Sequence, residues 1–103
     1  MYADLRQWPE IHADDVAARY FPDDPLTIVP LALAIGTVMH SAEAAILLAT
    51  NTGGDSDSVA SIAGAVLGAR LPETVNQEWY AAVETINGHD LTALGERLSA
   101  LRC

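Results

Sequence analysis

The segment from Val59 to Ala69 constrains the fold of this chain more than any other stretch. Its larger apolar residues recur at helical spacing and form one stripe, made of Val59, Ile62, Ala63, Val66 and Leu67. Every other position in the segment is Gly, Ala or Ser. Because such small residues let neighbouring backbones approach closely, the segment predicts a central, buried helix on which the rest of the chain packs.

The remaining sequence also predicts helices and no strands. The expected helices before the central one cover residues 14–21, residues 28–39 with Thr27 as their cap, and residues 42–50. No stretch alternates with period two for long enough to indicate a strand. The sequence therefore predicts an all-α fold, a compact bundle of about five or six helices in one domain that spans residues 1–103.

Two amphipathic helices are expected after the central one. Their apolar stripes consist of Val75, Trp79, Ala82, Val83 and Ile86 in the first, and of Leu91, Leu94, Leu98 and Leu101 in the second. A stripe of this kind is typical of a helix that buries one face, so both stripes are expected to face the core.

The six residues Gly53-Gly54-Asp55-Ser56-Asp57-Ser58 precede the central helix and carry its candidate chemistry. Paired glycines supply backbone conformations with positive φ and leave their amides open to a ligand. One interpretation of the two acids is structural, with Asp55 as the N-cap and Asp57 as a first-turn acid stabilised by the helix dipole.

A second interpretation is a metal site. Since each helical residue turns the chain by about 100°, the carboxylates of Asp55 and Asp57 converge only if Asp55 lies before the helix. Together with the Ser58 hydroxyl they would form an all-oxygen cluster suited to Mg²⁺ or Mn²⁺. Upstream, Asn51 either closes the preceding helix in a left-handed conformation or reaches the ligand with its side chain.

This motif and the small-residue helix that ends at residues 63–69 resemble the C-terminal metal motif of the ADP-ribosylglycohydrolases, the family of dinitrogenase reductase-activating glycohydrolase and the ADP-ribosyl-acceptor hydrolases. The resemblance extends over residues 26–100 and includes Val29-Pro30-Leu31-Ala32-Leu33 before the motif. It implies removal of ADP-ribose from a modified protein or small molecule at a site with two Mg²⁺ or Mn²⁺ ions.

The resemblance also implies roles for individual residues. Asp55, Asp57 and Ser58 correspond to metal ligands, with Asp57 as the bridge between the ions. Gly53 and Gly54 would let the loop approach the ribose, and Asn51 is a further candidate for substrate binding. Ser58 stands where Thr is common in the family, a change that keeps the hydroxyl group.

The family's N-terminal carboxylates have no counterpart in this sequence. Members of the family are about three times as long and build the site from both ends of the chain, so residues 1–103 are expected to be the C-terminal part of such a domain. Three oxygen ligands from one loop would hold Mg²⁺ weakly, and this chain alone is expected to be inactive. The alternatives are a module that binds metal or ADP-ribose without turnover, and an inactive structural remnant.

Two acidic pairs differ in their flanking residues from the Asp-Asp pair of the family's other metal motif, which Thr typically flanks on both sides. Here Asp14-Asp15 and Asp23-Asp24 are flanked instead by Ala, Val and Pro. Helix capping and a solvated turn are therefore the better interpretations of these pairs.

Composition bounds the possible partners. A net charge of −9 with five Arg and no Lys argues against binding nucleic acid or an anionic membrane through a basic patch.

No signal peptide is visible, and the longest apolar tract, residues 26–39, is shorter than the roughly 20 residues that cross a bilayer. Cys103 is the lone cysteine, so no internal disulfide is expected, and we expect a cytoplasmic location. Uncovered apolar faces would favour self-association or pairing with the missing N-terminal half.

Overall fold

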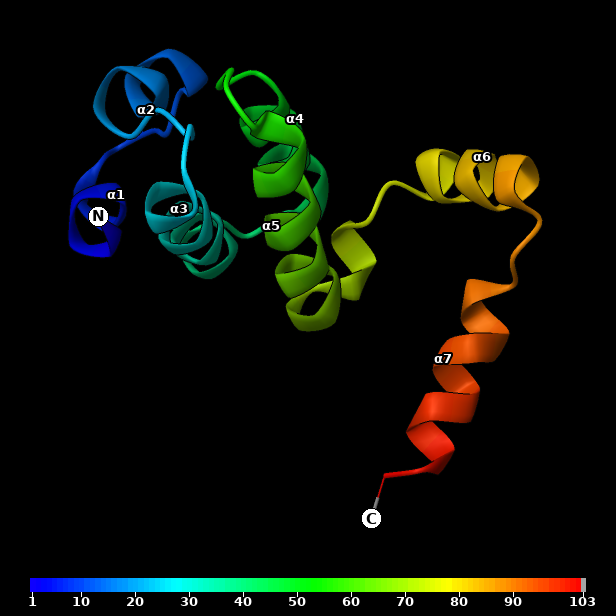
Figure 1. Ribbon diagram of the computed structural model, residues 1–103. Helices are drawn as coiled ribbons and strands as arrows, with labels where there is room; N and C mark the ends of the chain where they lie inside the picture. Colours follow the sequence, from blue (N-terminus) through cyan, green and yellow to red (C-terminus); the bar gives the residue numbers. More distant parts are fainter. Residues whose placement is uncertain (103) are drawn as a thin grey trace.

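The computed structural model describes residues 1–102, and within them it is entirely helical (Figure 1). The elements are α1 (Tyr2–Gln7), α2 (Ala13–Arg19), α3 (Pro25–Val38), α4 (Ala42–Thr50), α5 (Ser56–Arg70), the 3₁₀ helix η1 (Pro72–Thr74), α6 (Gln77–Asn87) and α7 (Leu91–Ala100). The all-α prediction is therefore confirmed. Cys103, on which the expectation about disulfides depends, lies outside the described residues.

Helix α5 packs against both α3 and α4 and forms the centre of the bundle (Figure 1). Its residues Val59, Ala63 and Leu67 are completely buried. A Cβ atom on Gly36 of α3 would lie 2.9 Å from the side chain of Val66, and one on Gly64 would lie 3.1 Å from Ile46. The close approach that the small residues predicted is thus confirmed on these two sides of α5.

Helix α3 begins earlier than the sequence predicted. Asp24, and not Thr27, is its N-cap, because the Asp24 side chain accepts hydrogen bonds from the backbone N–H groups of Leu26 at 2.8 Å and Thr27 at 3.2 Å. Pro25 follows as the first helical residue, where its fixed φ suits the helix and its missing N–H costs nothing. The predicted start was wrong because a good cap followed directly by proline outweighs a threonine further along.

Side chains connect the helices at the ends of the bundle. The Arg70 guanidinium, at the end of α5, donates to the carbonyl oxygens of Gly36, Thr37 and Met39 and so caps the C-terminus of α3. The Thr74 hydroxyl in η1 accepts from the N–H group of Ala42, the first residue of α4, at 2.7 Å. These contacts fix α5 and η1 against the two helices that flank them.

Helices α6 and α7 project from the bundle (Figure 1). Neither helix contains a buried residue, and the leucines of α7 are 42 to 60% exposed. The radius of gyration, 14.6 Å, exceeds the roughly 13 Å of a compact domain of this size. Val75, which precedes α6, packs against the core as expected. The expectation is wrong for the rest of both stripes, because periodicity identifies a face that needs cover but does not supply the partner.

None of the helices in residues 1–102 combines the length and the apolar character that a membrane span requires.

Candidate functional site

The loop before α5 has the backbone that its glycines predicted. Gly53 has a φ of 82° and Gly54 a φ of 56°, both in the left-handed region that favours glycine. A Cβ atom on Gly54 would also lie 2.6 Å from the carbonyl oxygen of Pro22. Gly54 is therefore required both by its conformation and by the space around it.

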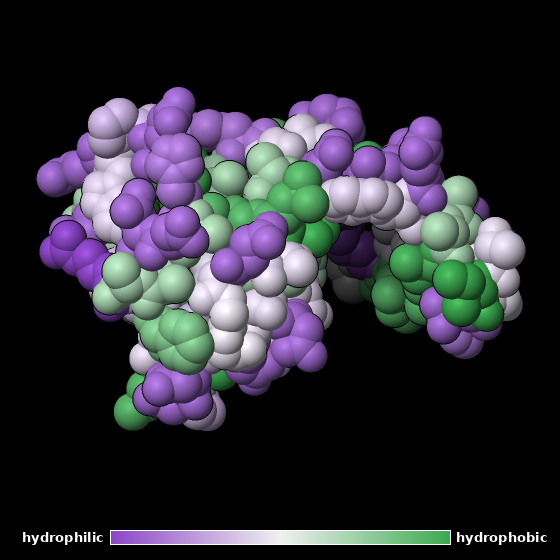
Figure 2. Space-filling view, turned by 90° about the horizontal axis from the view of Figure 1, so that it is seen from above, coloured by the Kyte–Doolittle hydropathy of each residue, from purple (hydrophilic) through white to green (hydrophobic). Residues whose placement is uncertain are grey.

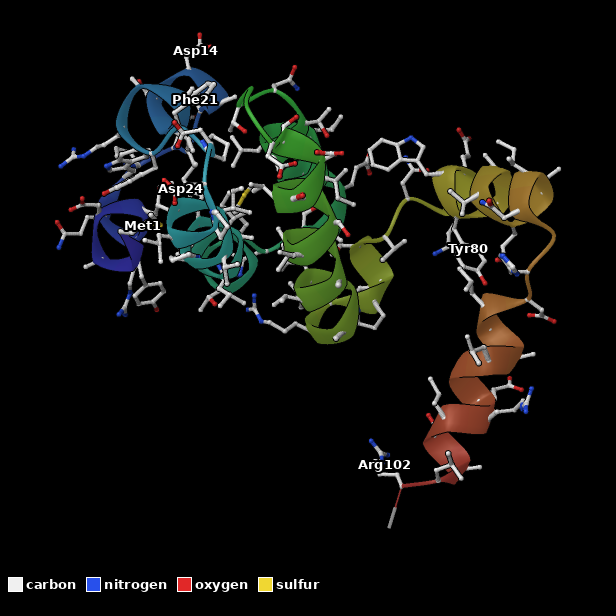
Figure 3. All side chains as sticks on the ribbon, viewed as in Figure 1. Met1, Asp14, Phe21, Asp24, Tyr80 and Arg102 are labelled. Carbon is white, nitrogen blue, oxygen red and sulfur yellow. The ribbon has the colours of Figure 1, made fainter. Side chains whose placement is uncertain are left out.

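A segment from a distant part of the sequence holds this loop in place. The N–H group of Asp55 donates to the carbonyl oxygen of Pro22 at 2.8 Å. The Phe21 ring lies against both glycines, 3.1 Å from the position of a Cβ on Gly53, and is 48% exposed (Figure 3). Sequence reasoning missed both residues, since no local pattern marks a contact between segments this far apart.

The structure brings Asp55, Asp57 and Ser58 together at the start of α5. Asp55 has a φ of −83° and a ψ of 56°, outside the helical region, while Asp57 lies in the first turn. Hydrogen bonding lowers the pKa of Asp55 from its ordinary value. The largest contribution comes from the Asp57 carboxyl group and the second from the Ser58 side chain. The expectation that Asp55 lies before the helix is thus confirmed.

The N-cap interpretation of Asp55 is confirmed for its position and only in part for its contacts. Asp55 occupies the N-cap position without a well-formed capping hydrogen bond, although the nearby N–H group of Ser58 contributes to its lowered pKa. Besides its contact with Asp55, the Asp57 carboxylate accepts from the adjacent N–H group of Ser58 at 3.0 Å. Both acids are exposed and Ser58 is half-buried, so their oxygens remain accessible to a ligand.

These oxygens fit part of a metal site. Two carboxylates and a hydroxyl are hard oxygen donors of the kind that Mg²⁺ and Mn²⁺ prefer, but Mg²⁺ requires a near-octahedral set. No group of three or more His, Cys, Asp or Glu side chains converges anywhere in residues 1–102. The loop therefore offers three donors, and further ligands would have to be water, substrate or another polypeptide segment.

Asn51 does not close α4 as the left-handed alternative predicted. Its φ is −96°, and no residue other than glycine has a positive φ in residues 1–102. Its N–H group donates to Leu48, and its side-chain Nδ2 donates to the carbonyl oxygen of Leu47 at 2.7 Å. An asparagine amide can complete the last turn in this way without the strain of a left-handed conformation.

The two acidic pairs have the structural roles that their flanking residues indicated. Asp14 and Asp15 lie in the first turn of α2, where the helix dipole favours negative charge. Asp24 caps α3.

One face of α5 remains uncovered. Ser61, Ala65 and Ala69 are exposed and follow Asp57 at intervals of one helical turn. The prediction of a buried helix is therefore confirmed toward α3 and α4 and wrong on this third side. The uncovered face begins at the acidic motif and consists of small residues, over which another backbone could pass closely.

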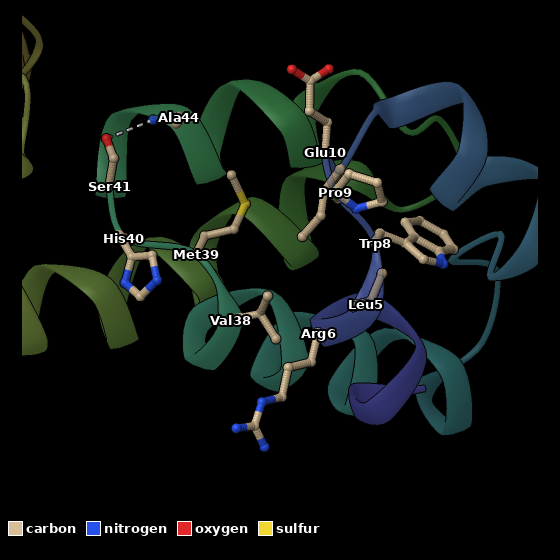
Figure 4. Close-up of a pocket in the computed structure, with 11 residues that line it drawn as sticks. Leu5, Arg6, Trp8, Pro9, Glu10, Val38, Met39, His40, Ser41 and Ala44 are labelled. Atoms are coloured by element: carbon tan, nitrogen blue, oxygen red, sulfur yellow. Dashed lines mark hydrogen bonds between the residues drawn. The ribbon is translucent and has the colours of Figure 1, made fainter.

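A separate hollow of about 450 Å³ lies between the α1–α2 connection and the junction of α3 with α4 (Figure 4). Its walls include Leu5, Trp8, Met39, His40 and Ser41. None of its lining residues belongs to the motif at the start of α5. This hollow is therefore distinct from the candidate site.

The sequence matches the model of a known protein family. The family model described as ADP-ribosylglycohydrolase matches residues 2–103. Searches of curated proteins and of solved structures found no match.

Proposed function

The chain belongs to the ADP-ribosylglycohydrolase family, and we propose that it supplies the Asp-x-Asp-Ser half of a binuclear Mg²⁺ or Mn²⁺ site that removes ADP-ribose from a modified acceptor. Family membership supports the glycohydrolase class. The observation that carries the finer proposal is the contact between the exposed carboxyl groups of Asp55 and Asp57, directly after two left-handed glycines.

Each residue of the loop has a separate task in this proposal. Asp55, Asp57 and Ser58 hold the cations, with Asp57 between them. When bound, the ions would orient the ribose hydroxyls and generate a nucleophilic water near neutral pH. The carboxylates would repel each other once both are ionised, and a divalent cation relieves that repulsion.

The glycines and Asn51 face the sugar side of the proposed site. The N–H groups of Gly53 and Gly54 have no protein acceptor within residues 1–102, which leaves them free to donate to ribose or diphosphate oxygens. The half-exposed Phe21 ring borders the same glycines and supplies an apolar wall. Asn51 is exposed at the entrance to the loop and retains its side-chain oxygen as an acceptor.

Hydrolysis requires a second polypeptide segment in this proposal. Three oxygen donors leave much of the coordination of two Mg²⁺ ions to water and substrate and would hold the ions weakly, and no other acid in residues 1–102 joins them. The uncovered face of α5 at Ser61, Ala65 and Ala69 starts at Asp57 and is the natural surface for such a segment. The same shortage of metal ligands favours a second function for the isolated chain. That function is the binding of metal or ADP-ribose without turnover.

Thermal unfolding with and without millimolar Mg²⁺ or Mn²⁺, with and without ADP-ribose, tests this proposal. A ligand that binds only the native state raises the midpoint by an amount that grows with its concentration. We expect a rise for the natural chain and its loss in Asp57→Asn.

The matched control is Asp14→Asn. Asp14 is also an exposed acid in the first turn of a helix, so this variant controls for the general effect of removing such a charge. It should keep the ligand-dependent rise. If no ligand shifts the midpoint of either the natural chain or Asp14→Asn, the proposed half-site does not exist. Hydrolysis of an ADP-ribosylated substrate by the chain alone would instead contradict the requirement for a second segment.

A further inference from the structure

The connection between α6 and α7 contains a chemically reactive pair of residues that the proposed function does not use. Asn87 is the last residue of α6, and Gly88 follows it with a φ of 66°. Of the asparagines at positions 51, 76 and 87, only Asn87 is followed by glycine. We propose that Asn87 is a site of spontaneous deamidation, and that opening of the last turn of α6 controls the rate of this reaction.

The reaction joins the backbone nitrogen of Gly88 to the side-chain carbonyl carbon, Cγ, of Asn87. As this bond forms, the bond between Cγ and Nδ2 breaks, and the proton of the Gly88 nitrogen leaves with the side-chain amine as ammonia. Water then opens the resulting succinimide ring. Attack of water at one ring carbonyl gives aspartate, and attack at the other gives isoaspartate, in which the main chain continues through the side chain.

Glycine at position 88 makes this ring closure possible. It has no side chain beside the attacking nitrogen, and even an added Cβ atom would meet nothing within 4 Å. Asn87 and Gly88 are both exposed, so water has access to the succinimide. The approach of the nitrogen and the hydrolysis that follows are therefore both unhindered.

The folded helix holds the two reacting groups away from each other. The Asn87 Nδ2 donates to the carbonyl oxygen of Val83 at 2.9 Å, and the Gly88 N–H group donates to the carbonyl oxygen of Glu84 at 2.9 Å. Ring closure must move both groups, so it proceeds from a state in which the last turn of α6 is open. The end of the molecule that α6 and α7 form stands across a hollow from the bundle (Figure 2), and α6 has no buried residue. Little packing opposes this opening, and we expect it to be frequent.

Asn51 provides a matched comparison within the same chain. It is also exposed at the end of a helix, and its Nδ2 also donates to the carbonyl oxygen four residues earlier, that of Leu47 at 2.7 Å. The following residue differs, because Thr52 is buried and its branched side chain lies beside the nitrogen that would have to attack. Asn51 should therefore keep its amide under conditions in which Asn87 loses it.

Deamidation would loosen the start of α7. A carboxylate at position 87 cannot donate to Val83, and it places negative charge beside the last carbonyl groups of α6, where the helix dipole disfavours it. Isoaspartate also adds one carbon to the main chain before Gly88. The same connection contains the bond from the N–H group of Leu91 to the Glu84 carboxylate, 3.0 Å long, so the change reaches the first residue of α7. None of these residues belongs to the proposed half-site, and the inference stands or fails independently of the proposed function.

Incubation of the full chain in mildly alkaline buffer, followed by peptide mass spectrometry and an isoaspartate assay, tests the proposal. We expect Asn87 to convert at least about tenfold faster than Asn51, because only Gly88 leaves the attacking nitrogen unhindered. Guanidinium chloride at a concentration that unfolds the chain should accelerate conversion at Asn87 at least about threefold, because it removes the protection of the last turn.

Gly88→Ala separates the chemistry from the opening of the helix. A Cβ atom on a residue with a φ of 66° strains the last turn and should make it open more often. The same Cβ atom hinders the attacking nitrogen, and we expect this variant to convert more slowly than the natural chain. Conversion at Asn87 no faster than at Asn51 would overturn the proposal. Equal rates in the folded and unfolded chain would also overturn it, as would a Gly88→Ala variant that converts as fast as the natural chain.

Discussion

The bundle of α1 to α5 and the arm of α6 and α7 both consist of amphipathic or apolar helices, yet they differ in what covers them. In α5 the residues Val59, Ala63 and Leu67 are completely buried, while the equivalent stripe of α7 is exposed along its whole length. A hydrophobic period therefore shows that a face needs a partner and leaves the partner unspecified. In the bundle that partner is another helix of the same fold, whereas in the arm no helix of residues 1–102 supplies it.

The largest effects should come from matched leucine substitutions in the two regions. Leu67→Ala removes a completely buried side chain from α5 and should lower the free energy of unfolding by about 3 kcal/mol. Leu98→Ala, at a site that is 60% exposed, should change it by less than about 1 kcal/mol in dilute protein. Urea unfolding measures both, and equal losses would mean that the arm is packed as tightly as the bundle.

Glycine-to-alanine substitutions should change the stability of the chain in opposite directions in the two regions. Gly54→Ala places a Cβ in a left-handed residue and 2.6 Å from the Pro22 oxygen, which should cost about 1 to 3 kcal/mol. Gly95→Ala in α7 meets nothing within 4 Å and should stabilise the chain by up to about 1 kcal/mol through helix propensity. Thermal unfolding compares them, and a stabilising Gly54→Ala would contradict the tight contact of the loop with Pro22.

Arginine substitutions should produce a smaller difference in stability between the two regions. Arg70→Gln removes the donor that caps α3 through three carbonyl oxygens and should cost about 1 kcal/mol. Arg97→Gln in the arm removes an exposed charge and should be nearly neutral in dilute protein. Denaturant midpoints of the two variants provide the comparison, and equal midpoints would show that the Arg70 contacts contribute nothing measurable.

The smallest expected effect is the pH-dependent contribution of Asp4, in the bundle, to the stability of the chain. A hydrogen bond from Tyr20, followed by the charge of Arg19 at 3.3 Å, lowers the pKa of Asp4 below its ordinary value of 3.8. Because the native pKa is depressed, the stabilisation is present above the unfolded pKa and is lost as pH falls through the native one. Asp4→Asn should therefore lower the unfolding midpoint slightly at neutral pH.

The difference between the natural chain and Asp4→Asn should disappear in acid. Thermal unfolding from neutral pH down to pH values below 3.8 measures it. A difference that stays constant over that range would show that the effect of the substitution is unrelated to ionisation of Asp4.

Much of the bundle could be predicted because its signals are local. The small-residue helix, the left-handed glycines and the position of Asp55 before the helix all follow from short-range sequence patterns, and the structure agrees with each. The start of α3 was misplaced because Asp24 and Pro25 compete with Thr27, and a single cap decides such a boundary.

The remaining features depend on contacts between distant segments. Nothing near Phe21 or Pro22 in the sequence indicates that they hold the loop at Gly54 and Asp55. Likewise, the stripes of α6 and α7 could not reveal that no helix in residues 1–102 covers them. The metal and substrate roles of the loop stay predictions, since they concern ligands and a second segment.

The hydrogen bond from Asp55 to Pro22 has a consequence for how the site loop opens. It closes a ring of backbone that contains α3 and α4, so the loop cannot swing away unless that bond breaks. The exchange of the Asp55 amide hydrogen with deuterated solvent should therefore be slow, although its side chain is exposed. One amide would then report how often the acidic motif comes free of the segment that positions it.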